Sequence, residues 1–288
     1  MSFAITTDSC CDLSVEFLRE NDIKFAQTPF FFGQETYTDD LWQTFTQEQF
    51  YSRMKKGEMP STAQVNPSAM IEIFEPHLKE GRDVLHVGFS IALSGTTNSA
   101  IMAATEMKDK YPNNKVVVVD SYSASTGLGV MVYMANKMRE QGKNMEEIAK
   151  WIDDNKLNLN HEFTVDDLMH LFRGGRVSRT TAIVGGMMGI KPTMCMDAAG
   201  KLAAKGKARG RKAALNALVD EMAKNSGKQH QIVAIGNGNC TEDAEYVRTL
   251  MNEKFEIENF IFSPIGPSIG THSGPGTIAI MYFGTPRK

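Results

Sequence analysis

Two apolar runs, each followed by a helical pattern, constrain the fold of this chain more than any other feature. Val84–Phe89 and Val116–Val119 are near-continuous hydrophobic segments bounded by turn residues, which is typical of strands buried on both faces. Helical patterns follow them at Thr96–Tyr111 and Thr126–Gln141. This alternation predicts a doubly wound parallel sheet, an α/β/α arrangement, in the first half of the chain.

Other segments of the first half extend the same pattern. Apolar runs at Phe3–Thr7 and Phe25–Phe32 are predicted strands. Three more helices are predicted, the last of them begun by a capping box of Asn144 and Glu147: Glu48–Lys56, Pro67–Lys79 and Met145–Asn155.

The second half also reads as α/β, with more glycine and more polar residues. Helices are predicted at Phe163–Gly174, Lys212–Asn225 and Glu242–Glu253, and strands at His230–Ile235 and Thr277–Phe283. A boundary near residues 155–160 is expected, which gives an N-terminal domain at 1–157 and a C-terminal domain at 158–288.

Composition limits the classes of function. The 288 residues are 42% hydrophobic and 23% charged, with a net charge of -3, which argues against nucleic acid as a partner. No apolar run approaches the ~20 residues that span a bilayer, so no stable membrane insertion is expected. The start, MSFAITTDSC, is unlike a signal peptide, and four cysteines do not suggest a disulfide framework. We therefore expect a cytoplasmic protein.

The segment Ser94-Gly95-Thr96 follows the predicted strand Val84–Phe89 and opens a helix. A helix start presents unpaired backbone N–H groups and a partial positive charge, which suits an anion. Ser94 and Thr96 add hydroxyl groups, and Gly95 permits close approach. The alternative is ordinary helix capping, since Ser and Thr are favoured there anyway. Ser94 does not lie in a G-x-S-x-G motif, and the sequence contains no P-loop, which argues against a nucleophile elbow at Ser94 and against an ATP site.

A second candidate is His272, which lies between hydroxyl residues and glycines in Ile269–Gly276. An imidazole among such small residues can donate a hydrogen bond to an oxyanion. The alternative is a tight turn with an exposed histidine. Thr62 and Arg176 complete a possible set, because arginine offers a planar fork for a carboxylate or phosphate. Taken singly, each also fits a turn residue or a surface charge.

Several other features are open to simpler explanations. The basic run Lys201–Lys212 holds six Lys and Arg residues and is either a solvated face or a docking patch. Ile235-Gly236-Asn237-Gly238-Asn239 follows a predicted strand, as a nucleotide-binding fingerprint would, but it lacks the third glycine and the acidic residue downstream. It therefore suggests an ordinary strand–helix connection. The adjacent Cys10-Cys11 pair lacks redox or zinc spacing, and the six histidines show no metal-ligand spacing, so no metal and no cofactor are expected. The small, Met-rich stretch Ala182–Gly189 is a candidate lining for an apolar tunnel.

Taken together, ordered motifs from residue 5 to 276 resemble the DegV family, the bacterial fatty-acid-binding proteins that serve as B components of fatty acid kinase. The chain departs from the family pattern at Cys10-Cys11 and Ala63, where small hydroxyl residues are more usual. The matching segments are Ile5-Thr6-Thr7-Asp8-Ser9, Ser61-Thr62-Ala63-Gln64, Leu93-Ser94-Gly95-Thr96, Val119-Asp120-Ser121, Gly174-Gly175-Arg176, Ile190-Lys191-Pro192, Arg209-Gly210-Arg211 and Gly270-Thr271-His272-Ser273-Gly274-Pro275-Gly276.

The resemblance implies two α/β domains, the second with a mixed sheet, and a long-chain fatty acid bound between them. Thr62 and Ser94 would be hydroxyl donors to the carboxylate, Gly95 would offer its N–H, and His272 would be the opposing contact. Arg176 would lie near the head group or on the surface that meets the kinase. The family's binding protein has no ATP site and presents its ligand to a separate catalytic subunit, which forms an acyl phosphate used in phospholipid synthesis.

Two other classes of function remain open at this stage. One is an acyl or phosphoryl transferase in its own right, with Ser94 as nucleophile and His272 as acid–base. A cleft between two domains also resembles the substrate-binding part of dihydroxyacetone kinases. The other is a docking or regulatory module, suggested only by Arg173, Arg176 and the basic run.

Overall fold

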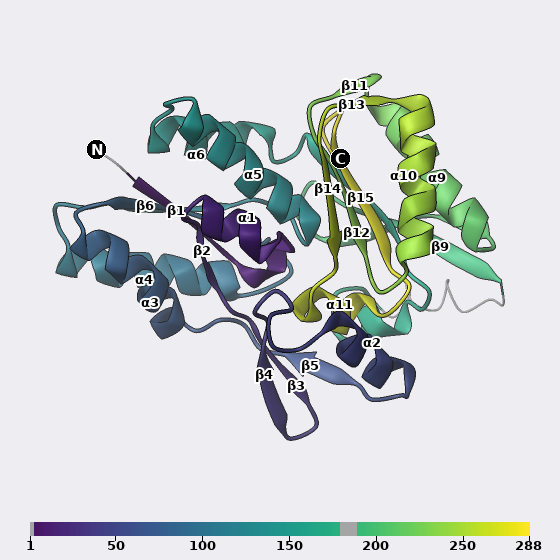
Figure 1. The fold of residues 1–288 in the computed structure, drawn as a ribbon, viewed down its shortest axis with the longest axis horizontal. Helices are drawn as coiled ribbons and strands as arrows, with labels where there is room; N and C mark the ends of the chain where they lie inside the picture. Colours follow the sequence, from purple (N-terminus) through teal and green to yellow (C-terminus); the bar gives the residue numbers. More distant parts are fainter. Residues whose placement is uncertain (1–2, 179–188) are drawn as a thin grey trace.

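The structure is a computed structural model that describes residues 3–178 and 189–288. A parallel sheet and a larger mixed sheet lie side by side, and a smaller antiparallel sheet lies below the place where they meet (Figure 1). Among the described residues, no helix combines the length and the apolar character that crossing a membrane requires.

The parallel sheet contains four strands in the order β2-β1-β6-β7, all paired in parallel. Helices cover both of its faces, because successive strand residues point to opposite sides: Val84 packs toward α3 and α4, and Leu85 toward α5. The predicted doubly wound arrangement is confirmed. The bounds are β1 Phe3–Asp8, β2 Lys24–Ala26, β6 Asp83–Gly88, β7 Val116–Asp120, α1 Val15–Glu20, α3 Pro67–Lys79, α4 Thr96–Lys110, α5 Thr126–Glu140 and α6 Met145–Asn155.

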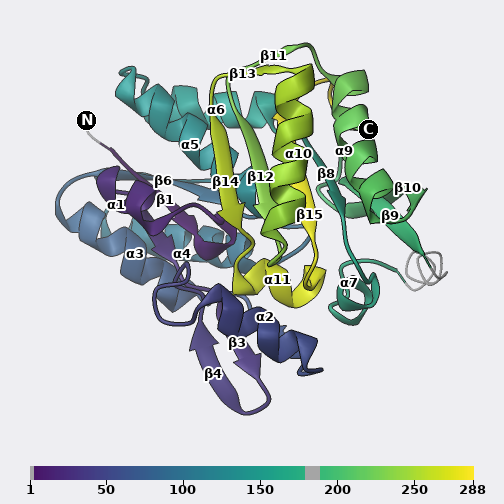
Figure 2. The same ribbon diagram turned by 45° about the vertical axis from the view of Figure 1, so that its right-hand side comes forward.

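The mixed sheet contains six strands in the order β10-β9-β8-β15-β12-β14. Helices α9 and α10 cover one face, while α5 contacts β12, β14 and β15 from the other side (Figure 2). Helix α5 therefore packs against both sheets. The bounds are β8 Leu159–Thr164, β9 Ile190–Met196, β10 Leu202–Arg209, α9 Arg211–Asn225, β12 Val233–Asn237, α10 Thr241–Lys254, β14 Phe260–Pro264 and β15 Ile278–Phe283. Two short strands, β11 (Gln229–His230) and β13 (Glu256–Ile257), pair in parallel as a separate sheet.

The smaller sheet contains β3 (Pro29–Phe32), β4 (Glu35–Thr38) and β5 (Pro60–Thr62), and packs on α2 (Gln47–Lys55). Its core is aromatic, with Phe30, Phe50 and Tyr51 fully buried. The Tyr51 hydroxyl donates to the Ile265 carbonyl at 2.9 Å, which ties this sheet to the start of helix α11 (Pro267–Ser273).

Three sequence predictions of secondary structure need correction. The single strand Phe25–Phe32 is two strands, because the chain leaves the parallel sheet after Ala26 and the Thr28 N–H donates to Ser9 Oγ. The segment His230–Ile235 is likewise split between β11 and β12. The helix predicted from Phe163 begins only at Met169, as α7 (Met169–Arg173), because Phe163 belongs to the buried strand β8.

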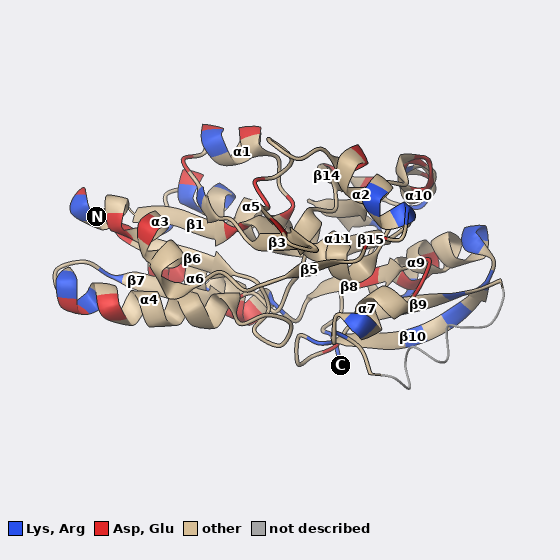
Figure 3. Cartoon of the chain, turned by 90° about the horizontal axis from the view of Figure 1, so that it is seen from below, with Lys and Arg blue, Asp and Glu red and all other residues tan. Residues whose placement is uncertain are grey.

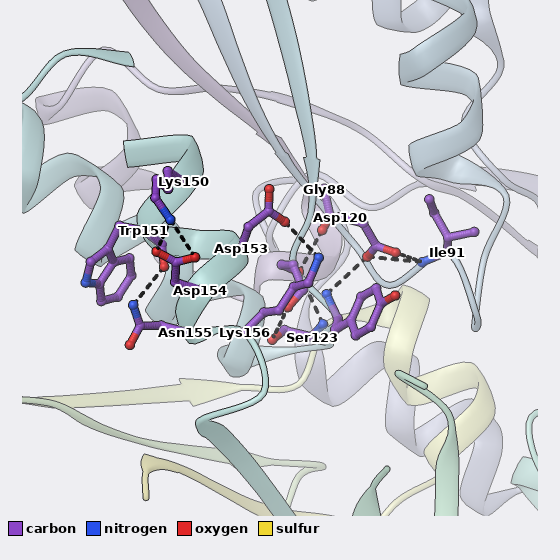
Figure 4. Close-up of polar contacts among 12 residues, drawn as sticks. Gly88, Ile91, Asp120, Ser123, Lys150, Trp151, Asp153, Asp154, Asn155 and Lys156 are labelled. Carbon is purple, nitrogen blue, oxygen red and sulfur yellow. Dashed lines mark hydrogen bonds and ion pairs between the residues drawn. The ribbon is translucent and has the colours of Figure 1, made fainter. Parts of the chain in front are cut away.

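The loop that joins β7 to α5 is fixed by side-chain contacts shown in Figure 4. Asp120 accepts hydrogen bonds from the backbone N–H groups of Ile91 and Tyr122, at 3.4 and 3.1 Å. The Lys156 ammonium lies 4.4 Å from the centre of the Tyr122 ring and pairs with Asp153 at 2.7 Å. These contacts define the path of a loop whose last residues border the cavity described next.

Candidate functional site

A cavity lies between the two large sheets and is lined from both. Residues of the first half meet residues of β8, β9, β10, β15 and α11 around it. Most of the lining is apolar, which suits a hydrocarbon ligand. The apolar and aromatic lining residues include Phe89, Leu93, Phe163, Leu171, Met196, Leu202, Ile265, Ile269, Ala279 and Met281.

Register explains how strands β8 and β15 contribute to this lining. Ala279 stands opposite Phe163, and Met281 opposite His161, in an antiparallel pair. Because strand side chains alternate between faces, these four lie on the same face of the sheet and all line the cavity. The candidate lining at Ala182–Gly189 falls, except for Gly189, outside the described residues.

Five of the six predicted site residues line the cavity: Thr62, Ser94, Gly95, Arg176 and His272. Two of them, far apart in sequence, are in direct contact: Thr62 Oγ1 lies 2.8 Å from His272 Nε2. Strand β5 places Thr62 opposite the buried Phe30 of β3, and helix α11 supplies His272. The hydroxyl and the imidazole thus join the smaller sheet to the second half of the chain.

The turn after α7 shapes the position of His272. A Cβ atom on Gly174 would lie 2.1 Å from His272 Nδ1, so only glycine lets the turn approach the ring so closely. Burial, followed by the positive charge of Arg176, lowers the pKa of His272 from 6.5 to about 4. The imidazole is therefore neutral near pH 7.

Arg176 connects the same turn to the loop before α4. Its Nε donates to the Leu93 carbonyl at 3.2 Å, and its Nη1 donates to the Gly174 carbonyl. Burial lowers the pKa of this guanidinium from its usual value of 12.5, yet arginine stays protonated at neutral pH. A single positive charge therefore lies beside Ser94, Gly95 and the Thr62–His272 pair.

The start of helix α4 was expected to present hydroxyl groups. Ser94 Oγ accepts from the Thr96 N–H at 3.2 Å and lies 3.1 Å from Thr96 Oγ1. The Val65 N–H donates to the same Thr96 oxygen at 3.2 Å. Thr96 is buried and outside the cavity lining, whereas Ser94 and the helix N-cap Gly95 are part of it. Thr96 Oγ1 thus accepts a hydrogen bond from the Ser94 hydroxyl and holds Ser94 in place at the edge of the cavity.

Several lining residues were not singled out from the sequence. Gln64 lies in the segment Ser61-Thr62-Ala63-Gln64, so its place in that motif was the available signal. Ser125, Ser268 and His161 also line the cavity. Ser268 is the serine of a G-x-S-x-G pattern at residues 266–270, whereas Ser125 and His161 lie in stretches without a recognisable motif. His161 lies in the buried strand β8, whose polar residues gave the sequence no apolar pattern typical of a strand.

A second cavity lies on the other side of the Thr62–His272 pair. It shares Thr62, Arg176 and His272 with the first, and Arg173 and His170 of α7 add two further basic side chains to its wall. Met59 lines it too and is 55% exposed. The shared residues therefore line two adjoining cavities, and Arg173 lines the second of them.

The basic run of the sequence lies elsewhere, mostly on β10 (Figure 3). Lys205 pairs with Glu162 at 2.6 Å, and Arg211 pairs with Asp243 at 2.8 Å. Lys207 and Arg209 are exposed. Among the residues that the structure describes, His, Cys, Asp and Glu side chains form no group of three that could hold a metal ion.

The fold and the cavity define an α/β protein built on two large sheets, with a mainly apolar cavity between them. Thr62, Ser94, Arg176 and His272 form a polar wall of this cavity. The sequence matches, over residues 2–285, the family described as "Uncharacterised protein, DegV family". A DegV domain-containing protein of Clostridium perfringens is 38% identical over 287 residues, which is 99% of both chains. The chain belongs to the DegV family.

Solved structures of this family share the whole fold. A DegV lipid-binding protein from Thermotoga maritima superposes with a TM-score of 0.88 at 26% identity, covering 100% of both chains. A fatty-acid-binding DegV family protein from Thermus thermophilus gives 0.89 at 25% identity, covering 99% of this chain and 100% of the other. The Fatty Acid Kinase (Fak) B3 protein of Streptococcus pneumoniae, loaded with linoleic acid, shares the fold with a TM-score of 0.84 at 22% identity, covering 98% and 99%.

Proposed function

We propose that this protein binds a long-chain fatty acid, with the acyl chain in the cavity between the sheets and the carboxylate at its polar wall. The observation that carries the proposal is the Thr62–His272 pair, which comes from the two halves of the chain and borders an apolar cavity. The fatty-acid-binding relative from Thermus thermophilus and the lipid-binding relative from Thermotoga maritima support the same ligand class.

The chemistry of the wall suits a carboxylate. Thr62 and Ser94 supply hydroxyls, Gly95 a backbone N–H, and Arg176 the positive charge that a buried carboxylate needs. His272 is neutral and supplies an imidazole nitrogen. Thr96 acts in this proposal through Ser94, whose hydroxyl it holds.

Affinity in this proposal comes chiefly from the acyl chain. Burial of each methylene contributes ~0.8 kcal/mol to the free energy of binding. Before the entropy cost of ordering the ligand is subtracted, a long acyl chain therefore contributes far more to binding than the head group does. The head group then selects the acid over other lipids of the same length.

We expect protein isolated gently from a bacterial host to carry a long-chain fatty acid. Native mass spectrometry should show a mass increment that is lost on delipidation and restored by adding palmitate. Hexadecanol is the matched control, because it has the same chain without a carboxylate. Failure to take up palmitate after delipidation, in a protein that remains folded, would refute the proposed ligand.

We further propose that the bound acid is presented to a separate ATP-dependent fatty acid kinase subunit, which forms the acyl phosphate in the cytoplasm. The second cavity supports this step, because Arg173 and Arg176 both line it together with Thr62 and His272. Cationic side chains there suit a transferring phosphoryl group. The chain's lack of a P-loop motif makes a partner with its own ATP site the simplest supply.

The competing proposal is a transferase that uses Ser94 as nucleophile and His272 as base. The geometry favours binding over attack, because His272 Nε2 is bonded to Thr62, while Ser94 Oγ is bonded to Thr96. We expect the pure protein, given ATP and palmitate, to form acyl phosphate only after a fatty acid kinase subunit is added. Turnover by the protein alone would favour the transferase.

A further inference from the structure

Helix α11, which carries His272, begins at two buried carboxylates that come from the other half of the chain. Asp12 Oδ1 accepts from the Gly266 N–H at 2.9 Å. Asp39 Oδ2 accepts from the Ser268 N–H at 3.1 Å and from the Ser268 hydroxyl at 2.6 Å. The free N–H groups of the first helical turn are thus bonded to side chains more than 200 residues away in sequence, as the separations of 254 and 229 show.

Both carboxylates are held at their second oxygen as well. Ser125 Oγ donates to Asp12 Oδ2 at 2.5 Å, and the Leu41 N–H donates to Asp39 Oδ1 at 3.3 Å. Asp12 and Asp39 are 2% and 1% exposed, so neither side chain has room to change its conformation freely. A Cβ on Gly266 would lie 2.6 Å from Asp12 Oδ1, which shows how closely the helix start approaches.

Burying two acidic groups this close together is costly, and ordinary capping does not require it. Burial raises the pKa of Asp39 to about 6, and burial also raises that of Asp12. A serine or asparagine within the helix's own sequence would satisfy the same N–H groups at lower cost. Because Asp12 and Asp39 belong to the first half of the chain, their hydrogen bonds also fix the position of α11 relative to that half.

Helix α11 depends on such anchors because it is short and intrinsically weak. It spans seven residues, with internal bonds from the Gly270 N–H to the Gly266 carbonyl and from the Gly274 N–H to the Gly270 carbonyl. Gly270 lies inside the helix and lowers its helix propensity by ~1 kcal/mol relative to alanine. His272 lies one turn after Ser268, so a shift of the helix start moves the imidazole directly.

We propose that Asp12 and Asp39 are positioning residues, which fix helix α11 so that His272 stays against Thr62 and the site discriminates a carboxylate from an uncharged head group. This inference rests on the proposed fatty-acid binding. The two aspartates act through α11, since it is His272 that touches Thr62.

The test compares the dissociation constants for palmitate and hexadecanol in each variant. Their ratio cancels effects on the acyl chain and on the amount of folded protein. In Asp39→Ala we expect the preference for palmitate to fall at least about tenfold. Asp12→Asn is the conservative control, because its carboxamide oxygen still accepts from Gly266 and its NH₂ can donate to Ser125; it should keep the preference, whereas Asp12→Ala should lose it.

Ser268→Ala provides a milder variant if Asp39→Ala does not fold, since it removes only the hydroxyl donor to Asp39 and leaves the N–H bond. It should lower the palmitate preference several-fold while thermal unfolding stays close to that of the parent. If the parent protein itself does not prefer palmitate, the proposed function fails. If the parent prefers palmitate and the folded variants prefer it equally, the positioning role is wrong.

Discussion

Replacing His272 with alanine is expected to weaken binding of palmitate by ~10–100-fold, with little change in the affinity for hexadecanol. The imidazole is one of the few polar groups on the head-group wall, and a hydrogen bond to a buried carboxylate is worth ~1.5–3 kcal/mol. Thr62 would also lose the partner that orients its hydroxyl. Isothermal titration of the delipidated protein with both ligands measures the two affinities.

The effect of this substitution should be the same at pH 6 and pH 8. The pKa of His272 is lowered to about 4, by burial first and by Arg176 second, so the group removed is neutral at both values. His230→Ala is a matched control, because His230 is also buried but bonds to Ser226 and Gly227 away from the cavity. Equal losses of affinity for palmitate and hexadecanol would show that His272 supports the fold and does not recognise the carboxylate head group.

Replacing Ala279 with phenylalanine is expected to weaken binding of palmitate by ~100-fold or more. Ala279 faces the cavity between Thr277 and Met281, and the ring would occupy space that the acyl chain takes in our proposal. Excluding about four methylenes from apolar contact costs ~3 kcal/mol at ~0.8 kcal/mol each. Octanoate, with fewer methylenes to exclude, should lose less. Fluorescence displacement across a series of chain lengths tests this.

The ligand-free Ala279→Phe protein should remain about as stable as the parent, because the ring fills space that is already open. Ala204→Phe is the control, since Ala204 is exposed on β10 and outside the cavity lining. A thermal melt of both variants without lipid separates misfolding from blockage. Unchanged palmitate affinity in a folded Ala279→Phe protein would place the acyl chain elsewhere.

Much of the fold of the first half could be predicted from the sequence, because its core strands are continuous apolar runs. The strand Val84–Phe89 and the helix Pro67–Lys79 are observed as β6 and α3 with little or no change in bounds. Strand β6 lies in a sheet buried on two faces, where burial imposes a continuous apolar run, and α3 covers one of these faces. The capping box of Asn144 and Glu147 likewise forms as predicted.

The second half was harder to predict because its buried strands contain polar residues. In β8, Asn160 donates to the Thr285 carbonyl and Glu162 pairs with Lys205, so polar side chains are satisfied inside the core. Such partners are distant in sequence and leave no periodic signal. Thr62 and His272 were recognisable through motifs, whereas the anchoring roles of Asp12 and Asp39 follow only from contacts across more than 200 residues.

The position of α5 between the two sheets has a consequence for how the molecule unfolds. A single hydrophobic cluster joins Leu85 of the parallel sheet, Leu128 and Met131 of α5, and Met194 and Met281 of the mixed sheet. Loss of either sheet would expose apolar surface on the other, although each half also has a smaller hydrophobic cluster of its own. We therefore expect the two large sheets to unfold together, in one cooperative transition.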